Sequence, residues 1–328
     1  MQSYSARKLL VSCWMAALFL AAAVGCSPTL ERAASHGGES IRQKMDIRAG
    51  GFRRSILVHI PRGYDPSDPY PLVVVLHGAF STARQIEAHS GFSDLADREG
   101  FLVLYPNGIS LFGLLQHWNA GHCCGKAAAD GLDDVGFLQA AIQEVAVHLN
   151  VDPARIYMTG FSNGGMMTHR FGAEACGLLA AIAPMAGSLG GRAGPDAPFW
   201  QVPEPACALP VAILHGRDDE QVPYRGGGAR GKEQARQYLS VDESAAFWVR
   251  ANGCNLEGEE TSLHQGTVHL KRWNGCHNGS EVRVYTWENW GHAWPGPPFT
   301  DGLAPDDPFR GFHAAETVWE FFKNHTRR

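Results

Sequence analysis

Residues 157–166 read Tyr-Met-Thr-Gly-Phe-Ser-Asn-Gly-Gly-Met, and this stretch decides the fold. Residues 155–159 have the character of a short buried strand, and residues 166–173 can continue as a helix. Ser162 then lies at a sharp bend between strand and helix. A Cβ two residues before or after the bend would collide with the neighbouring elements, which explains the glycines at 160 and 164. We interpret the stretch as a nucleophile elbow.

The Gly-X-Ser-X-Gly pattern alone is weak evidence in a chain with 38 glycines among 328 residues. The interpretation requires a parallel sheet before the bend. It also requires an acid and then a histidine later in the chain.

Predicted strands and helices alternate along the rest of the sequence. The predicted strands are residues 53–60, an antiparallel edge strand, and 72–76, 101–105, 178–185, 211–214 and 282–287. The predicted helices are residues 85–99, 135–149, 241–252 and 314–322. Asp133 or Asp134 is expected to cap the second helix, and Ser240 with Glu243 forms a capping box for the third. The order predicts an α/β class protein with the α/β-hydrolase fold, a mostly parallel central sheet flanked by helices.

Composition fits a folded protein, with 45% hydrophobic residues over 328 positions. The formal charge is −5, and removing residues 1–25, which carry Arg7 and Lys8 and no acid, makes it −5 − 2 = −7. This balance argues against a nucleic-acid partner. The sequence specifies no oligomeric state.

The N-terminus has the features of an export signal. Arg7 and Lys8 precede an apolar run, and the segment ends Ala-Val-Gly before Cys26. We expect a lipoprotein-type signal peptide over residues 1–25, cleavage before a lipidated Cys26, a flexible tether over 26–44 and one catalytic domain over 45–328. Plain secretion is the alternative, and about 16 apolar residues is short for a permanent membrane anchor. Either route places the protein outside the cytoplasm, in a bacterial cell envelope or secreted.

Cysteine usage agrees with an oxidising compartment. Setting aside Cys13 and Cys26 leaves six of the eight cysteines, enough for three disulfides with fifteen connectivities. Cys254 with Cys276 is the first pair that we expect. The other candidates are Cys123, Cys124, Cys176 and Cys207. No second ligand pair at zinc-like spacing accompanies His122-Cys123-Cys124, so we predict no metal site there.

A serine nucleophile needs an imidazole base and an acid that orients it. His292 follows the last predicted strand in a loop rich in glycine and proline. Asp218 and Asp219 both follow the strand at 211–214, and spacing does not choose between them. We expect the oxyanion of the reaction to accept backbone N–H groups from Asn163 and from Ala79 or Phe80.

Aromatic residues near these positions are candidate walls of a substrate pocket. Trp118, Phe161 and Trp294 are the candidates. Tryptophan is found in cores more often than in pockets, so the core is the alternative position for the two tryptophans.

Several separate motifs together resemble one known family. These are 76–78 (Leu-His-Gly), 118–119 (Trp-Asn) with 123–125 (Cys-Cys-Gly), 133–137 (Asp-Asp-Val-Gly-Phe), the elbow, 215–216 (His-Gly) with Asp219 and 222–224 (Val-Pro-Tyr), and 291–296 (Gly-His-Ala-Trp-Pro-Gly). The set resembles the polyhydroxybutyrate depolymerase and feruloyl esterase family of secreted α/β hydrolases, and its elbow is similar to that of the lipoprotein-type members.

The resemblance implies a serine carboxylester hydrolase without a cofactor that acts through Ser162, Asp219 and His292. It selects Asp219, because the family's acid stands four residues after the histidine of the His-Gly turn. The chain departs from the family at 79–81 (Ala-Phe-Ser), where many members have a glycine-rich or cysteine-containing turn. Polymer-degrading members of the family usually carry a separate substrate-binding domain, and we expect none after residue 328. The expected substrates are therefore soluble or short esters, either feruloyl or aryl esters or hydroxyalkanoate oligomers.

Two other functions fit the same sequence. A peptidase or thioesterase can use the same fold and triad. A lipid-anchored binding protein could keep the fold without turnover, although three candidate triad residues in the expected order favour an enzyme.

Overall fold

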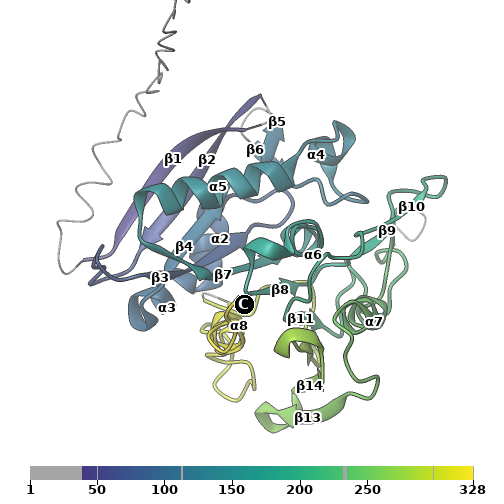
Figure 1. The fold of residues 1–328 in the computed structure, drawn as a ribbon. Coiled ribbons are helices and arrows are strands. Elements are labelled where there is room, and N and C mark those ends of the chain that lie inside the picture. Colours follow the sequence, from purple (N-terminus) through teal and green to yellow (C-terminus); the bar gives the residue numbers. More distant parts are fainter. Residues whose placement is uncertain (1–38, 50, 112–113, 232–234, 298, 328) are drawn as a thin grey trace, which may run out of the picture.

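One ten-stranded sheet organises the chain (Figure 1). The computed structural model describes residues 39–49, 51–111, 114–231, 235–297 and 299–327. In spatial order the strands are β1 (Ile41–Ala49), β2 (Phe52–Ile60), β4 (Leu102–Pro106), β3 (Tyr70–Leu76), β7 (Val151–Phe161), β8 (Ala181–Met185), β11 (Val211–Gly216), β15 (Val282–Trp287), β14 (Val268–Trp273) and β13 (Glu259–Leu263).

The six central strands, from β4 to β15, run parallel, and the two strands at each edge are antiparallel. The predicted mostly parallel sheet is therefore confirmed. Leu76 of β3 is in register with Gly160 of β7, so both strands end at the same edge of the sheet. Parallel strands place their functional loops at this carboxyl edge.

Helices cover both faces of the sheet, which explains the unbroken apolar runs of its central strands. Leu72, Val74 and Leu76 of β3 face one core, and Val73 and Val75 face the other. The first core is covered by α5 (Asp134–His148), α6 (Asn163–Glu174) and α7 (Val241–Ala251). The second is covered by α2 (Ala83–Ser90), α3 (Phe92–Glu99) and α8 (Ala314–Phe322).

Helix ends follow the sequence signals closely. Asp133, not Asp134, caps α5, and its side chain accepts a hydrogen bond from the Gly136 N–H at 2.8 Å. The capping box of Ser240 and Glu243 is present at α7. The predicted helix 85–99 is instead two helices, because Gly91 at φ 76° ends α2 and begins α3.

Residues 53–60 lie in an antiparallel strand, β2, as predicted, but β2 is not at the edge of the sheet. β1 pairs antiparallel with the whole of β2, from Ile41 opposite Ile60 to Ala49 opposite Phe52, so β1 is the edge. The sequence did not predict β1, and its first four residues fall within the predicted tether 26–44. The predicted signal peptide and Cys26 lie outside the described residues.

Two small sheets, which the sequence did not predict, lie beside the main one. One has three strands in the spatial order β10 (Phe199–Gln201), β9 (Gly190–Arg192) and β12 (Gln237–Tyr238). The other consists of β5 (Ile109–Leu111) and β6 (Leu114–His117). Four short helices are also described, which are α4 (Gly125–Ala129), η1 (Cys176–Leu178), η2 (His264–Gly266) and η3 (His277–Gly279). His117 and Tyr238, from the two small sheets, both line the pocket described below.

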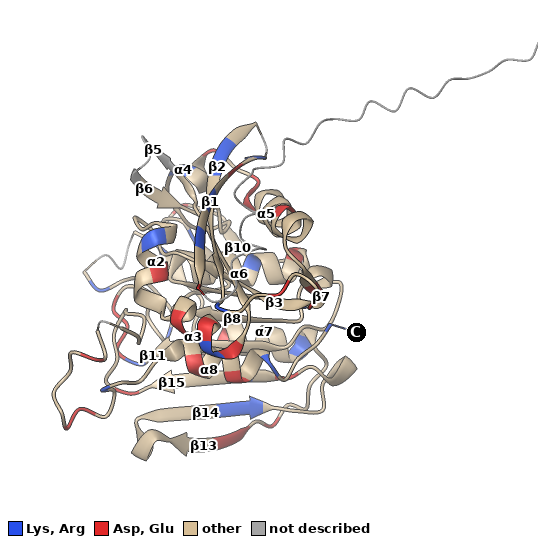
Figure 2. Cartoon of the chain, turned by 90° about the vertical axis from the view of Figure 1, so that its left-hand side faces the viewer, with Lys and Arg blue, Asp and Glu red and all other residues tan. Residues whose placement is uncertain are grey.

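Charged residues of both signs are interspersed on the face shown in Figure 2. β13 and β14, for example, carry opposite charges on paired positions, and Lys271 Nζ lies 2.9 Å from Glu260 Oε1. Within the described ranges, no helix has both the length and the apolar character needed to cross a membrane.

Candidate active site

Ser162 lies in the turn that joins β7 to α6, as the glycine spacing predicts. Its backbone angles are φ 55° and ψ −117°, a strained conformation for a residue with a side chain. A Cβ on Gly160 would lie 2.6 Å from the Gly164 carbonyl oxygen, and a Cβ on Gly164 would lie 2.5 Å from the His77 carbonyl oxygen. The close contact of β3, β7 and α6 therefore requires glycine at both positions.

A chain of hydrogen bonds links the serine to a histidine and an aspartate from distant segments. The His292 Nε2 atom lies 2.9 Å from Ser162 Oγ, and its Nδ1 atom lies 2.6 Å from Asp219 Oδ2. The side chains of His292 and Asp219 are 9% and 0% exposed. Of the two aspartates that spacing left open, Asp219 contacts the imidazole, while the Asp218 N–H donates to the Trp290 carbonyl.

The surroundings of Asp219 keep it ionised and oriented. Its Oδ1 atom accepts hydrogen bonds from the Gln221 and Val222 N–H groups, each at 2.8 Å. Its Oδ2 atom lies 3.2 Å from His215 Nε2 as well as facing His292. Burial acts to raise the pKa of the Asp219 carboxyl, but the hydrogen bonds from His215 and His292 outweigh it and hold that pKa well below its usual range.

Backbone N–H groups beside Ser162 are the candidates for binding a developing oxyanion. Asn163 begins α6, where N–H groups have no intrahelical acceptor. The Phe80 N–H donates to the Gln116 carbonyl at 2.9 Å, so it is not available to a substrate. Of the two candidates from the 79–81 turn, this leaves Ala79.

A pocket of about 710 Å³ opens above Ser162. Phe161 and Trp294 line it, together with Phe80 and Phe299, two residues that are more than half exposed. Trp118 does not line the pocket, which corrects the prediction. It is fully buried in the core and stacks on Phe137 at 6.4 Å between ring centroids.

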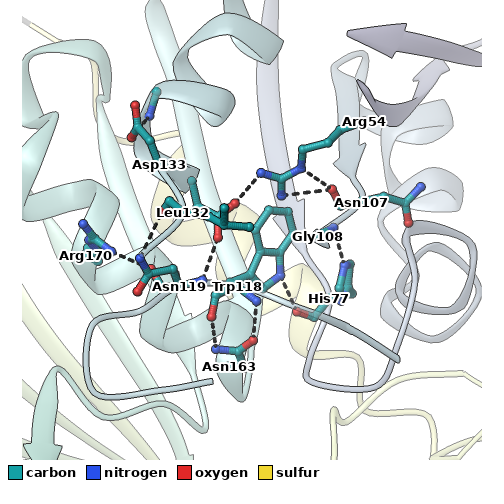
Figure 3. A network of polar contacts seen from close by, with 12 residues as sticks. Arg54, His77, Asn107, Gly108, Trp118, Asn119, Leu132, Asp133, Asn163 and Arg170 are labelled. Atoms are coloured by element: carbon teal, nitrogen blue, oxygen red, sulfur yellow. Dashed lines mark hydrogen bonds and ion pairs between the residues drawn. The ribbon is translucent and has the colours of Figure 1, made fainter. Parts of the chain in front are cut away.

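Trp118 instead belongs to a buried polar network beside the elbow (Figure 3). We call this the Trp118 network and define it as Arg54, His77, Trp118, Asn119, Asp134 and Asn163. The Asn163 side chain accepts from the Trp118 N–H at 2.7 Å and donates to the Trp118 carbonyl at 3.0 Å. The Trp118 indole donates to the His77 carbonyl at 2.9 Å. These bonds tie the first residue of α6 to the turn after β3.

An ion pair anchors the far side of the network. Arg54 Nη1 pairs with Asp134 Oδ1, and the Asn119 N–H donates to Asp134 Oδ2 at 2.6 Å. The Arg54 guanidinium also stacks 3.6 Å above the Phe137 ring centroid. His77 is structural, since its Nε2 accepts from the Gly108 N–H at 2.9 Å and burial lowers its pKa to about 4.

The six cysteines that were expected to pair form three disulfides, which are Cys123–Cys124, Cys176–Cys207 and Cys254–Cys276. The expected Cys254–Cys276 pair is confirmed. Three disulfides fit a protein of an extracytoplasmic compartment. Over the described part of the chain, no cluster of three or more His, Cys, Asp or Glu residues could hold a metal ion.

Sequence reasoning missed several pocket residues. Phe299 and Tyr238 were not singled out because no motif marks them. Arg54 of the Trp118 network was also missed, although it is a charged residue two positions before the run Ile56–Ile60, which is buried throughout.

Comparisons with known proteins agree with this geometry. A family model described as esterase PHB depolymerase matches residues 55–202. Feruloyl esterase B of Piromyces equi is 29% identical over 247 residues, covering 73% of this chain and 42% of that protein. NocK of Nocardia uniformis subsp. tsuyamanensis, named as an esterase, is 31% identical over 268 residues, covering 77% of this chain and 74% of that protein.

Among solved structures, the acetyl xylan esterase from Aspergillus awamori superposes with a TM-score of 0.58 at 14% identity, over 86% of this chain and 99% of that one. At this identity the likeness establishes the α/β-hydrolase fold. Fold and relatives together define the class, which is that of the carboxylic ester hydrolases. Within this class the chain belongs to the esterase PHB depolymerase family.

Proposed function

We propose that the protein is a serine carboxylester hydrolase that works through Ser162, His292, Asp219 and a covalent acyl-enzyme. The observation that carries this proposal is the hydrogen-bond chain from Ser162 Oγ through the His292 imidazole to Asp219. A hydroxyl on a strained turn, an imidazole in contact with it and a buried carboxylate behind the imidazole are the parts that acyl transfer needs.

In the first half-reaction, Ser162 Oγ attacks the ester carbonyl carbon while His292 Nε2 takes the hydroxyl proton. The carbonyl oxygen becomes an oxyanion and accepts hydrogen bonds from the Asn163 and Ala79 N–H groups. Removing one such donor typically costs about 3 kcal/mol in the transition state. His292 then gives its proton to the leaving alkoxide, and the acyl group remains on Ser162.

In the second half-reaction, water attacks the acyl-enzyme while His292 takes its proton. Collapse of the second tetrahedral intermediate releases the acid and returns the proton to Ser162 Oγ. Asp219 stays ionised throughout, because it accepts two backbone hydrogen bonds in addition to those from His215 and His292. Its charge fixes the imidazole tautomer and stabilises the imidazolium.

The pocket supports soluble or short esters as substrates. A volume of about 710 Å³ suits a small or medium ligand. Aromatic lining by Phe161, Trp294 and Phe299 suits an aryl or alkyl group. We propose feruloyl or aryl esters, or hydroxyalkanoate oligomers, as the substrate classes.

Purified protein lacking residues 1–26 tests the proposal. It would be assayed with p-nitrophenyl acetate, methyl ferulate and hydroxybutyrate oligomers beside Ser162→Ala. Ser262→Ala, which alters an exposed serine of β13, is the matched control. We expect a p-nitrophenol burst that Ser162→Ala abolishes and Ser262→Ala retains. Equal rates for the wild type and Ser162→Ala would refute the proposal.

We also propose export through the signal peptide at residues 1–25, with lipid attached to Cys26 and the catalytic domain outside the cytoplasm. The three disulfides support export. Mass spectrometry of the mature N-terminus is the test. A diacylglyceryl group on Cys26 supports anchoring, and an unmodified N-terminus contradicts it.

A further inference from the structure

Among the described residues that line the pocket at Ser162, one side chain carries a permanent charge. Arg236 is the arginine of the pocket lining, and the described lining residues include no Asp, Glu or Lys. The Nε atom of Arg236 is buried and has no hydrogen-bond acceptor among the described residues. Its Nη1 atom lies 4.0 Å from Cys124 Sγ, a sulfur that cannot neutralise a cation.

This lack of a counter-ion sets Arg236 apart from other shielded arginines. Arg54, Arg170 and Arg283 have side chains at most 18% exposed, and each pairs with a carboxylate. Arg236 is half-buried, and no carboxylate in the described ranges lies within ion-pair distance of it. Taking a cation out of water without an anion is unfavourable, so a site of this kind is completed by an anionic ligand.

The fold holds Arg236 in place. It immediately precedes β12, whose Gln237 and Tyr238 are in register with Arg192 and Gly191 of β9. The Cys123–Cys124 disulfide lies against its guanidinium. A guanidinium fixed in this way has its donors oriented before a ligand arrives.

The positive charge of Arg236 also reaches other side chains. Burial lowers the pKa of His117, which lines the pocket, and the charge of Arg236 lowers it further. Burial lowers the pKa of His122 to about 3, again with a contribution from Arg236. This part of the pocket is therefore electropositive, although the whole chain has a formal charge of −5.

We propose that Arg236 binds a free carboxylate on the ester substrate, so that the enzyme prefers esters with an anionic end over neutral ones. The inference rests on the proposed function and narrows its substrate class. Arginine matches a carboxylate with two parallel N–H bonds. Hydroxyalkanoate oligomers carry a free carboxylate at one end, whereas a methyl or sugar ester of ferulic acid carries none. Arg236 thus favours the oligomers.

Two matched ester pairs test the proposal on both sides of the scissile bond. p-Nitrophenyl hydrogen adipate and its methyl ester differ by a carboxylate on the acyl side. 4-Acetoxybenzoate and its methyl ester differ by a carboxylate on the leaving group. The wild type should have a kcat/KM about 10- to 100-fold higher for the anionic member of at least one pair, as expected for hydrogen bonds to a charged group.

Arg236→Met should abolish that preference while changing kcat/KM for the neutral ester less than about threefold. Arg236→Lys keeps the positive charge but loses the planar guanidinium that can bind a carboxylate with two hydrogen bonds. It should therefore retain part of the preference. The matched control is Arg230→Met, which removes an arginine that pairs with Glu220 and is 75% exposed, and it should keep the full preference. No preference in either pair, or an equal loss on both members in Arg236→Met, overturns the proposal.

A binding measurement separates this proposal from the proposed function. Monomethyl adipate would be titrated calorimetrically into Ser162→Ala and into Ser162→Ala/Arg236→Met. We expect at least tenfold weaker binding by the double variant, and a smaller difference at high salt. Equal binding overturns the role of Arg236 even where the wild type is an active esterase. Arg236-dependent binding supports it even where turnover is absent.

Discussion

Arg54 and Arg236 show how differently the two regions around Ser162 are built. Arg54 belongs to the Trp118 network, where its charge is paired with Asp134 and stacked on Phe137. Arg236 lines the pocket with no paired carboxylate in the described chain. The side chains of the first region are hydrogen-bonded to one another, so their role is to position the elbow. The second has unused bonding capacity, so it is the region that can select a substrate.

The largest expected effect falls on the proposed triad, whose Ser162 stands beside the first region and lines the pocket of the second. Asp219→Asn would present an amide N–H to His292 Nδ1 and favour the wrong tautomer, so kcat should fall about 10⁴-fold. Asp218→Asn, which changes the neighbouring aspartate, is the matched control and should stay within about threefold of the wild type. Steady-state kinetics on p-nitrophenyl acetate measure both. If Asp218→Asn lost more kcat than Asp219→Asn, Asp218 and not Asp219 would be the acid of the triad.

The next largest effect should appear in stability, within the Trp118 network. Asp134→Ala leaves the buried Arg54 guanidinium without its carboxylate and the Asn119 N–H without an acceptor. Breaking a buried pair in this way costs about 3–5 kcal/mol of unfolding free energy. Urea unfolding followed by circular dichroism measures it. Asp130→Ala, which breaks an exposed pair with Lys126, should cost less than about 1 kcal/mol.

If Asp134→Ala proved as stable as Asp130→Ala, the distinction between a paired, structural region and a substrate-facing region would be lost. Restoring stability with Arg54→Met/Asp134→Leu would support the distinction. Such a double variant removes both charges from the interior.

A smaller effect is expected at His122, which lies in the chain between Asn119 of the Trp118 network and Cys123 of the pocket lining. Its ring stacks on Trp200 at 5.7 Å between centroids, and burial lowers its pKa to about 3. The unfolded chain takes up this proton near pH 6.5, so stability present above that pH is lost as pH falls toward 3. At pH 5 the loss from this one group is about 2 kcal/mol.

His122→Phe cannot take up the proton. Between pH 7 and pH 5 it should therefore lose about 2 kcal/mol less unfolding free energy than the wild type. Urea titrations of both proteins at the two pH values give the difference. Identical losses would show that His122 is protonated to the same extent in the folded and unfolded chains.

The smallest stability effect should come from the pocket rim. Phe299 is 53% exposed, so Phe299→Ala should change the unfolding free energy by less than about 0.5 kcal/mol. Its loss should still raise KM for p-nitrophenyl butyrate, by about fivefold for roughly 1 kcal/mol of apolar contact. Leu256→Ala, at an 83% exposed position outside the pocket lining, should change neither quantity.

The same two regions explain what could be predicted from the sequence. Ser162 was predictable because the glycines at 160 and 164 are a local steric requirement. The central strands were predictable because burial on both faces demands an apolar run. Asp219 could be chosen over Asp218 only through the family resemblance, because both follow the same strand.

Contacts between distant segments were not predictable. Arg54 and Asp134 are 80 residues apart, and nothing in either local sequence indicates the pair. Trp118 was assigned to the pocket because residue type does not distinguish a buried indole from a pocket wall. The place of Arg236 in the pocket depends on three segments that meet there, those of residues 123–124, 162 and 236.

The central claim is that Ser162 is the nucleophile in both half-reactions. The most direct test is to label the wild type with an organophosphate such as diisopropyl fluorophosphate and to locate the phosphoryl group by peptide mass spectrometry. We predict one group per chain, on the peptide containing Ser162, with esterase activity lost in proportion to labelling. Full inactivation with the label on any other residue, or activity that persists in a fully labelled protein, would contradict the account.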